Sequence, residues 1–115
     1  MAHILVIDDD HAICSFISKI LCHLGYEVKV AHNGEEGIEL LKKYDYFQMV
    51  ITDIRMPRKD GNSVAKYIRS SAKSYDTPVL AITGFLNDVQ RDLFDIVLEK
   101  PFKTKDLINV INFFQ

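Results

Sequence analysis

Five short apolar runs, each followed by an amphipathic segment, constrain the fold of this chain more strongly than any other feature of its sequence. The predicted strands lie near residues 3–7, 27–31, 48–52, 78–82 and 96–99. The predicted helices lie near residues 10–24, 35–44, 62–73, 87–94 and 104–114. Strands that read as continuous Ile, Val, Leu and Met are covered on both faces, which is typical of a parallel sheet. A βα unit repeated in this way predicts a three-layer α/β sandwich.

The composition is that of one ordinary soluble domain, and we expect a single domain over residues 1–115. Of the 115 residues, 48% are hydrophobic and 26% are charged, and a chain of this length is typical of one domain. A net charge of −2 without a block of Lys and Arg argues against direct binding to nucleic acid. No apolar stretch is as long as a membrane span, so the sequence predicts no membrane association and a cytoplasmic location.

Charged residues follow three of the predicted strands at the point where each strand ends. Asp8 and Asp9 follow the first strand, Asp53 follows the third and Lys100 follows the fifth. In a parallel sheet these ends lie at one edge, where open α/β folds bind their ligands. Three carboxylates would repel one another unless a divalent cation lay among them, and Mg²⁺ prefers such oxygen ligands. The run from Asp8 to Asp10 could simply cap the first helix, but that alternative does not account for Asp53 and Lys100.

The same strand ends supply the groups needed to accept a phosphoryl group. A carboxylate such as Asp53 can attack phosphorus and form an acyl phosphate when a metal neutralises the incoming oxygens. Lys100 offers a positive charge to the product. Thr83, which ends the fourth strand, offers a hydroxyl donor, and Gly84 beside it leaves room and a free backbone N–H. A plain strand-end or capping role for Thr83 remains an open alternative.

In their order along the chain, these motifs resemble the receiver domain of two-component response regulators. The motifs are Val6-Ile7-Asp8-Asp9-Asp10, Thr52-Asp53-Ile54-Arg55-Met56-Pro57 with Asp60-Gly61, Ala81-Ile82-Thr83-Gly84 and Lys100-Pro101-Phe102. The resemblance runs from Ala2 to the end of the chain. It implies a flavodoxin-like fold with a five-stranded parallel sheet in the order 2-1-3-4-5, flanked by five helices. The fourth of these helices should be shortened in this chain.

The resemblance implies a Mg²⁺ site and a phosphoacceptor. Asp8, Asp9, Asp53 and the backbone carbonyl of Arg55 would hold Mg²⁺ as the cofactor. Asp53 would accept the phosphoryl group from a sensor histidine kinase or a histidine phosphotransfer protein. Phosphorylation would then change the affinity of the domain for a downstream protein target.

The resemblance also implies how the phosphoryl group is recognised. Thr83 and Lys100 would contact it and drive the switch, and the Lys100–Pro101 peptide would be cis. Such a domain is a signalling module rather than an enzyme, with self-directed phosphotransfer and slow autodephosphorylation as its only chemistry. We expect a monomer or a weak dimer. A stand-alone regulator and a fragment of a longer protein are both compatible with the sequence.

Two departures from the family pattern point to an atypical output face. The family's switch usually couples the position of Thr83 to an aromatic residue three positions before the lysine, and Val97 stands there instead. A valine cannot swing between buried and exposed states as Tyr or Phe does. The segment between Thr83 and Lys100 is also shorter than in typical receivers, by about one helical turn or more.

Aromatic residues lie near both the expected pocket and the output face. Phe85, Phe94 and Phe113 could all lie on or near that face. We expect at least two of them in the core, and an exposed aromatic patch for a partner is the alternative. Arg55 and Phe85 flank the pocket at positions that are variable in the family, and we expect the pair to hinder attacking water and to lengthen the phosphoryl lifetime.

Three competing functions remain on the sequence alone. A receiver-like protein-binding module whose output does not depend on phosphorylation would explain Val97, but it would not need an intact pocket. A metal-dependent phosphohydrolase would place a second carboxylate two residues after its nucleophile, where this chain has Arg55. A flavin-binding protein of the same fold is a poorer match, because Asp8, Asp9 and Asp10 would repel the cofactor's phosphate.

Overall fold

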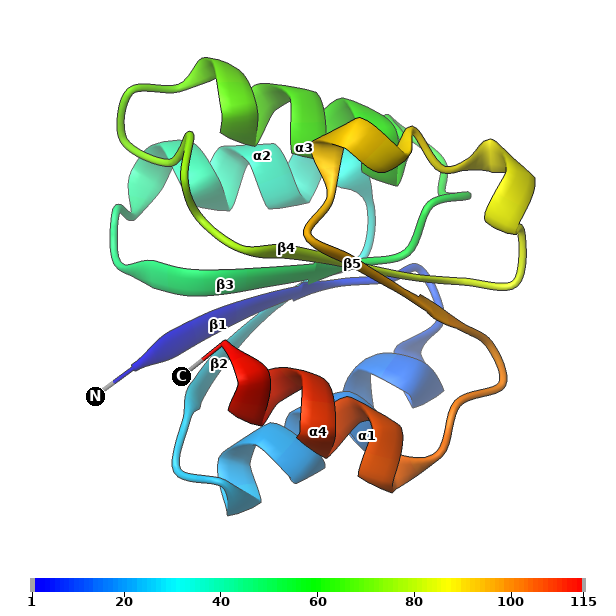
Figure 1. Ribbon diagram of the computed structural model, residues 1–115. Helices are drawn as coiled ribbons and strands as arrows, with labels where there is room; N and C mark the ends of the chain where they lie inside the picture. Colours follow the sequence, from blue (N-terminus) through cyan, green and yellow to red (C-terminus); the bar gives the residue numbers. More distant parts are fainter. Residues whose placement is uncertain (1, 115) are drawn as a thin grey trace.

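The computed structural model describes residues 2–114 as alternating strands and helices (Figure 1). The five strands in this range are β1 (His3–Ile7), β2 (Glu27–Ala31), β3 (Phe47–Thr52), β4 (Val79–Thr83) and β5 (Ile96–Glu99). The four α-helices are α1 (His11–His23), α2 (Gly34–Lys43), α3 (Gly61–Ser70) and α4 (Thr104–Phe113). No helix in residues 2–114 has the length and apolar character needed to cross a membrane.

The strands form one parallel sheet with the order β2-β1-β3-β4-β5, which confirms the predicted topology. Figure 1 shows α2 and α3 on one face of this sheet and α1 and α4 on the other. The predicted three-layer sandwich is therefore present. Because all five strands point the same way, their carboxyl ends lie at one edge of the sheet.

Two hydrophobic cores lie on opposite faces of the sheet. The first joins the sheet to α1 and α4 and contains Ile17, Leu21, Leu107 and Ile111. The second joins it to α2 and α3 and contains buried side chains from both helices. Each fully buried aliphatic side chain contributes about 1.5–3 kcal/mol relative to an exposed one. The two cores therefore hold the central strands rigidly between them.

Helix α1 begins and ends where the sequence predicts. Asp10 caps its N-terminus, because its Oδ1 atom accepts hydrogen bonds from the N–H groups of Ala12 at 2.9 Å and Ile13 at 3.3 Å. Gly25 follows the helix with a φ of 97°, a left-handed conformation that favours glycine at a helix C-terminus. The Asp10 cap therefore fixes the point at which the chain turns from the end of β1 into the helix.

The prediction of five helices, with a shortened fourth helix near residues 87–94, is wrong. The structure has two single 3₁₀ turns there, η1 (Leu86–Asp88) and η2 (Arg91–Leu93). The buried side chain of Asn62 donates to the backbone carbonyl of Asp88 at 2.7 Å and accepts from the N–H of Gln90 at 2.9 Å. Those backbone groups are therefore satisfied outside a helix, and so short a helix is only marginally stable by itself.

Candidate functional site

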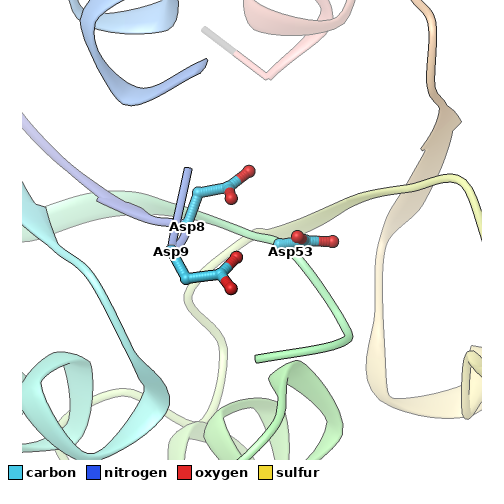
Figure 2. Close-up of side chains that lie close together, drawn as sticks. All are labelled: Asp8, Asp9 and Asp53. Atoms are coloured by element: carbon cyan, nitrogen blue, oxygen red, sulfur yellow. The ribbon is translucent and has the colours of Figure 1, made fainter. Parts of the chain in front are cut away.

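Three carboxylates meet at the carboxyl edge of the sheet. Asp8 and Asp9 follow β1, Asp53 follows β3, and one oxygen from each lies within 4.8 Å of the others. Figure 2 shows the three side chains pointing in the same direction from these two strand ends. Asp8 and Asp53 are only 2% and 9% exposed, whereas Asp9 is exposed. The structure thus brings together the acidic residues that the sequence singles out.

Backbone hydrogen bonds of the sheet continue one residue past the strands and fix these carboxylates. The N–H of Asp53 donates to the carbonyl of Ile7 at 2.9 Å, and the N–H of Asp8 donates to the carbonyl of Ala31 at 3.0 Å. One oxygen of each buried carboxylate also accepts a backbone N–H: Asp53 from Ile54 at 2.8 Å and Asp8 from Asp10 at 2.9 Å. The second oxygen of each remains available to another partner.

Lys100 takes up those second oxygens. Its Nζ atom lies 3.0 Å from Oδ2 of Asp8 and 3.3 Å from Oδ2 of Asp53. The backbone N–H of Lys100 donates to the carbonyl of Thr83 at 2.9 Å, which anchors the residue at the end of β5. The following Lys100–Pro101 peptide is cis, as expected. One ammonium group therefore bridges two carboxylates that would otherwise repel each other.

Burial dominates the electrostatics of this cluster. It raises the pKa of Asp8, although hydrogen bonds from the Asp10 N–H and from Lys100 oppose the rise, and the nearby charge of Asp53 adds to it. Burial lowers the pKa of Lys100, but the hydrogen bond and charge of Asp8 and the charge of Asp53 outweigh that effect, so the pKa is raised overall. Lys100 is thus charged at neutral pH, and a cation near Asp8 would relieve an unfavourable charge.

Thr83 lies at the same edge with its hydroxyl beside the backbone that follows β4. The residue is fully buried, and its Oγ1 atom accepts a hydrogen bond from the N–H of Phe85 at 2.9 Å. This bond uses an acceptor lone pair and leaves the hydroxyl proton free to be donated. A Cβ atom at Gly84 would meet no heavy atom within 4 Å beyond its chain neighbours, so there is open space at this position.

A pocket of about 480 Å³ lies between the loop after β3 and the segment that follows β4. Its lining includes Arg55, Phe85, Asp88 and Glu99. The Nε atom of Arg55 donates to Oδ2 of Asp88 at 2.6 Å, and the guanidinium carbon lies 3.6 Å from the centroid of the Phe85 ring. Arg55 and Phe85, the two residues expected to flank the pocket, therefore contact each other directly.

The aromatic residues differ from the expectation. Phe85 is 47% exposed and Phe113 is 75% exposed, so the expectation that at least two of the three phenylalanines lie in the core is wrong. Phe94 is partly buried against the second core.

Two residues matter here in ways that sequence reasoning missed. A Cβ atom at Gly61 would collide with the backbone carbonyl oxygen of Asp53, so only glycine fits. The Asp60-Gly61 pair belongs to the motif that resembles receiver domains, but the sequence alone does not show that Gly61 packs against the backbone of Asp53. Asn62, which fixes the segment after β4, gives no local signal, because its partners lie 26 and 28 positions away.

Solved structures with the same fold are signalling proteins. The chain superposes on the chemotaxis protein CheY4 of Vibrio cholerae with a TM-score of 0.90 and 28% identity, covering 100% of this chain and 99% of that one. It also matches the response regulator protein TrrA of Thermotoga maritima, solved in complex with Mg(2+)-BeF, with a TM-score of 0.89 and 30% identity over all of both chains. The fold is therefore the CheY-like variant of the flavodoxin fold.

Sequence comparisons agree with that class. The family model for the response regulator receiver domain matches residues 4–112. The response regulator receiver protein CpdR of Brucella abortus is 36% identical over 118 residues, which cover 96% of this chain and 94% of that protein. The transcriptional regulatory protein CpxR of Escherichia coli is 33% identical over 113 residues, 94% of this chain but 47% of that protein. This chain belongs to the family of response regulator receiver domains, the signalling domains of two-component systems, and it spans about half the length of relatives such as CpxR.

Proposed function

We propose that this chain is a phosphorylation switch. In this proposal Asp53 accepts a phosphoryl group from a histidine kinase or a histidine phosphotransfer protein, and the modified domain changes its affinity for a protein partner. The observation that carries the proposal is the bridge from Lys100 to Asp8 and Asp53 at the sheet edge. The bridge supports the proposal, because the ammonium group of Lys100 contacts both the proposed phosphoacceptor and a second carboxylate.

The donor set at this edge fits Mg²⁺. Carboxylates of Asp8, Asp9 and Asp53, with the backbone carbonyl of Arg55, would supply hard oxygen ligands of the kind that this ion prefers. When bound, Mg²⁺ would neutralise the oxygens of an incoming phosphoryl group. The raised pKa of Asp8 supports this assignment, because a cation would relieve the cost of its buried charge.

In the proposed phosphoryl transfer, Asp53, Lys100 and Thr83 each have a separate role. A carboxylate oxygen of Asp53 attacks phosphorus, and the new O–P bond forms as the P–N bond of the donor phosphohistidine breaks, with its electron pair returning to the imidazole. Lys100 moves its ammonium group from the two carboxylates to an oxygen of the phosphoryl group, and the hydroxyl of Thr83 donates a hydrogen bond to another. Positioning and charge carry such a transfer more than bond-making groups do.

Intact-mass spectrometry tests the proposal directly. The protein is incubated with Mg²⁺ and a small phosphodonor, and we expect one added phosphoryl group on the parent chain and none on Asp53→Asn, which keeps the shape and removes the nucleophile. Asp92→Asn, an exposed carboxylate in η2, is the matched control and should be modified like the parent. A parent chain that stays unmodified, with candidate kinases as well, rules out the phosphoacceptor role.

The output face of this proposed switch is atypical. Val97 replaces the aromatic residue that the family uses, and two 3₁₀ turns replace the helix that precedes β5. Phe85 is half exposed on this side of the sheet. We infer that partners bind a surface formed by the segment between β4 and β5 together with β5, and that this surface differs in shape from that of receivers with a full helix there.

These same features favour a second candidate function, a binding module whose output does not depend on phosphorylation. The two candidate functions differ in whether the affinity for a partner depends on phosphorylation of Asp53. If the partner binds parent and Asp53→Asn equally, with and without phosphodonor, the module is independent of phosphate. A change in affinity that needs both the donor and Asp53 supports the switch.

A further inference from the structure

The side chain of Arg55 is held on two sides by the segment that follows β4. Its Nε atom donates to Oδ2 of Asp88 at 2.6 Å, and its guanidinium carbon stacks 3.6 Å from the centroid of the Phe85 ring. We call these three residues, Arg55, Phe85 and Asp88, the arginine clamp. The side chains of Arg55 and Asp88 are 58% and 38% exposed, so solvent weakens their ion pair.

The clamp joins the phosphoacceptor end of β3 to the segment of residues 84–90. Arg55 follows Asp53 by two positions, and the N–H of Phe85 is bonded to the hydroxyl of Thr83. Asp88 is held a second time, because its backbone carbonyl accepts from Asn62 at 2.7 Å. A change at Asp53 is therefore two residues from the clamp, a change at Thr83 is one hydrogen bond from it, and the clamp includes Asp88 of η1.

We propose that phosphorylation of Asp53 opens the arginine clamp: the guanidinium group of Arg55 leaves Asp88 for the phosphoryl oxygens, and the segment of residues 84–90 loosens. This inference rests on the proposed function and adds the route by which the modification is transmitted. Asp88 acts in it as a positioning residue, which holds Arg55 in the unphosphorylated state. The route avoids Val97, which cannot report a change by swinging.

The charges favour this exchange of partners. Among the residues that the structure describes, Arg55 makes a hydrogen bond only through Nε, so both terminal nitrogens are free to bind an oxyanion. A phosphoryl group adds negative charge and three acceptor oxygens two residues away. The planar guanidinium fork matches such a group in two parallel hydrogen bonds, whereas Asp88 holds it by one.

Competition for one guanidinium group predicts the effect of removing Asp88. If Arg55 must leave Asp88 to bind the phosphoryl group, Asp88→Asn should bind Mg²⁺ with beryllium fluoride, a phosphoryl mimic, about two- to five-fold more tightly than the parent. Titration calorimetry measures the two affinities. Glu99→Gln is the matched control: Glu99 is exposed, lines the same cavity and forms no ion pair within residues 2–114, so its removal should leave the affinity unchanged.

A double-mutant cycle separates this competition from a general effect of charge. In an Arg55→Ala background, Asp88→Asn should no longer tighten binding of the mimic, because no guanidinium group remains to be released. Equal tightening in the presence and absence of Arg55, or equal tightening by Glu99→Gln, would show a long-range electrostatic effect and overturn the clamp.

Hydrogen exchange gives the structural readout. In the parent, the mimic should increase the exchange of amides in residues 86–90, and in Asp88→Asn these amides should already exchange faster without the mimic. Unchanged or slower exchange in the mimic-bound parent overturns the proposal. The intact-mass experiment distinguishes failure of the proposed function from failure of this inference. If no phosphoryl adduct forms, the phosphoacceptor role is wrong. If an adduct forms but the clamp does not open, only the inference about the clamp is wrong.

Discussion

At the scale of single residues, the charged groups of this site have few fixed partners. Asp8 and Asp53 each hold one oxygen with a backbone N–H and the other with Lys100. The ammonium group of Lys100 has no partners other than these two carboxylates within residues 2–114. A group held by side-chain contacts alone can exchange partners without moving the backbone, which suits a lysine that must turn toward a new phosphoryl group.

Phe85 and Arg55 should slow the loss of that phosphoryl group. In the phosphorylated state proposed above, Arg55 binds the phosphoryl oxygens and Phe85 follows Thr83 by two positions, so the two side chains should hinder an attacking water molecule. We expect the double variant Phe85→Ala/Arg55→Asn to lose the phosphoryl group about three- to tenfold faster, a change of roughly 1 kcal/mol in barrier. The decay of the phosphorylated mass with time measures the rate. Tyr75→Ala, which removes an exposed aromatic residue elsewhere, serves as the control, and equal rates for parent and double variant would contradict the prediction.

At the scale of elements, side chains from α3 replace the missing helix as supports of the chain between β4 and β5. Asn62 holds the middle of the segment through Asp88 and Gln90. Arg69 holds its end, because its Nε atom donates to the carbonyl of Leu93 at 3.1 Å and its Nη2 atom pairs with Asp95 at 2.8 Å. Polar contacts from one helix thus fix a segment that has no buried residue in either turn.

The substitution Asn62→Ala should therefore destabilise the protein. Asn62 is 7% exposed, and its loss leaves a backbone carbonyl and a backbone N–H without their partners. We expect the free energy of unfolding to fall by about 1–3 kcal/mol, measured by denaturant titration. Lys66→Ala, on the exposed face of the same helix, should change it by less than about 0.5 kcal/mol. Equal stability of Asn62→Ala and parent would mean that the segment is held by other contacts.

Features that depend on residues close together in the sequence could be predicted, and features that depend on residues far apart in the sequence could not. The strands, α1 and the acidic cluster could be predicted, because apolar runs, the Asp10 cap and the strand ends are local patterns. The segment near residues 87–94 was predicted as a helix because its partner, Asn62, lies far away in the sequence. The pairing of Arg55 with Asp88 was missed for the same reason, since the two residues are 33 positions apart.

At the scale of the whole molecule, two hydrophobic cores stabilise the sheet, whereas a buried carboxylate at its carboxyl edge lowers the free energy of unfolding. Burial raises the pKa of Asp8 above its ordinary value, so the folded state binds this proton more tightly than the unfolded state does. The charged carboxylate therefore destabilises the protein above its folded pKa, and this cost disappears as the pH falls toward the unfolded value. The hydrophobic cores on either side of the sheet supply stability that outweighs the cost of this buried charge.

Removal of this charge should stabilise the protein in a pH-dependent way. We expect Asp8→Asn to raise the free energy of unfolding at pH 7 by on the order of 1 kcal/mol, and the gain should shrink as the pH falls and the parent's Asp8 takes up its proton. Denaturant titrations of parent and variant between neutral and acid pH measure the difference. Asp92→Asn should show no such trend, and a gain for Asp8→Asn that grows toward acid pH would reverse the sign of the argument.

The side-chain supports of the segment between β4 and β5 have a consequence for the divergence of this protein. Neither turn has a fully buried residue, although Leu93 packs against the second core, and the side chains that anchor the segment lie on α3 and on the loop after β3. Its exposed residues can therefore be replaced without repacking the interior. Duplicated genes could acquire new interaction specificities by exchanging this one stretch while the rest of the fold is inherited unchanged.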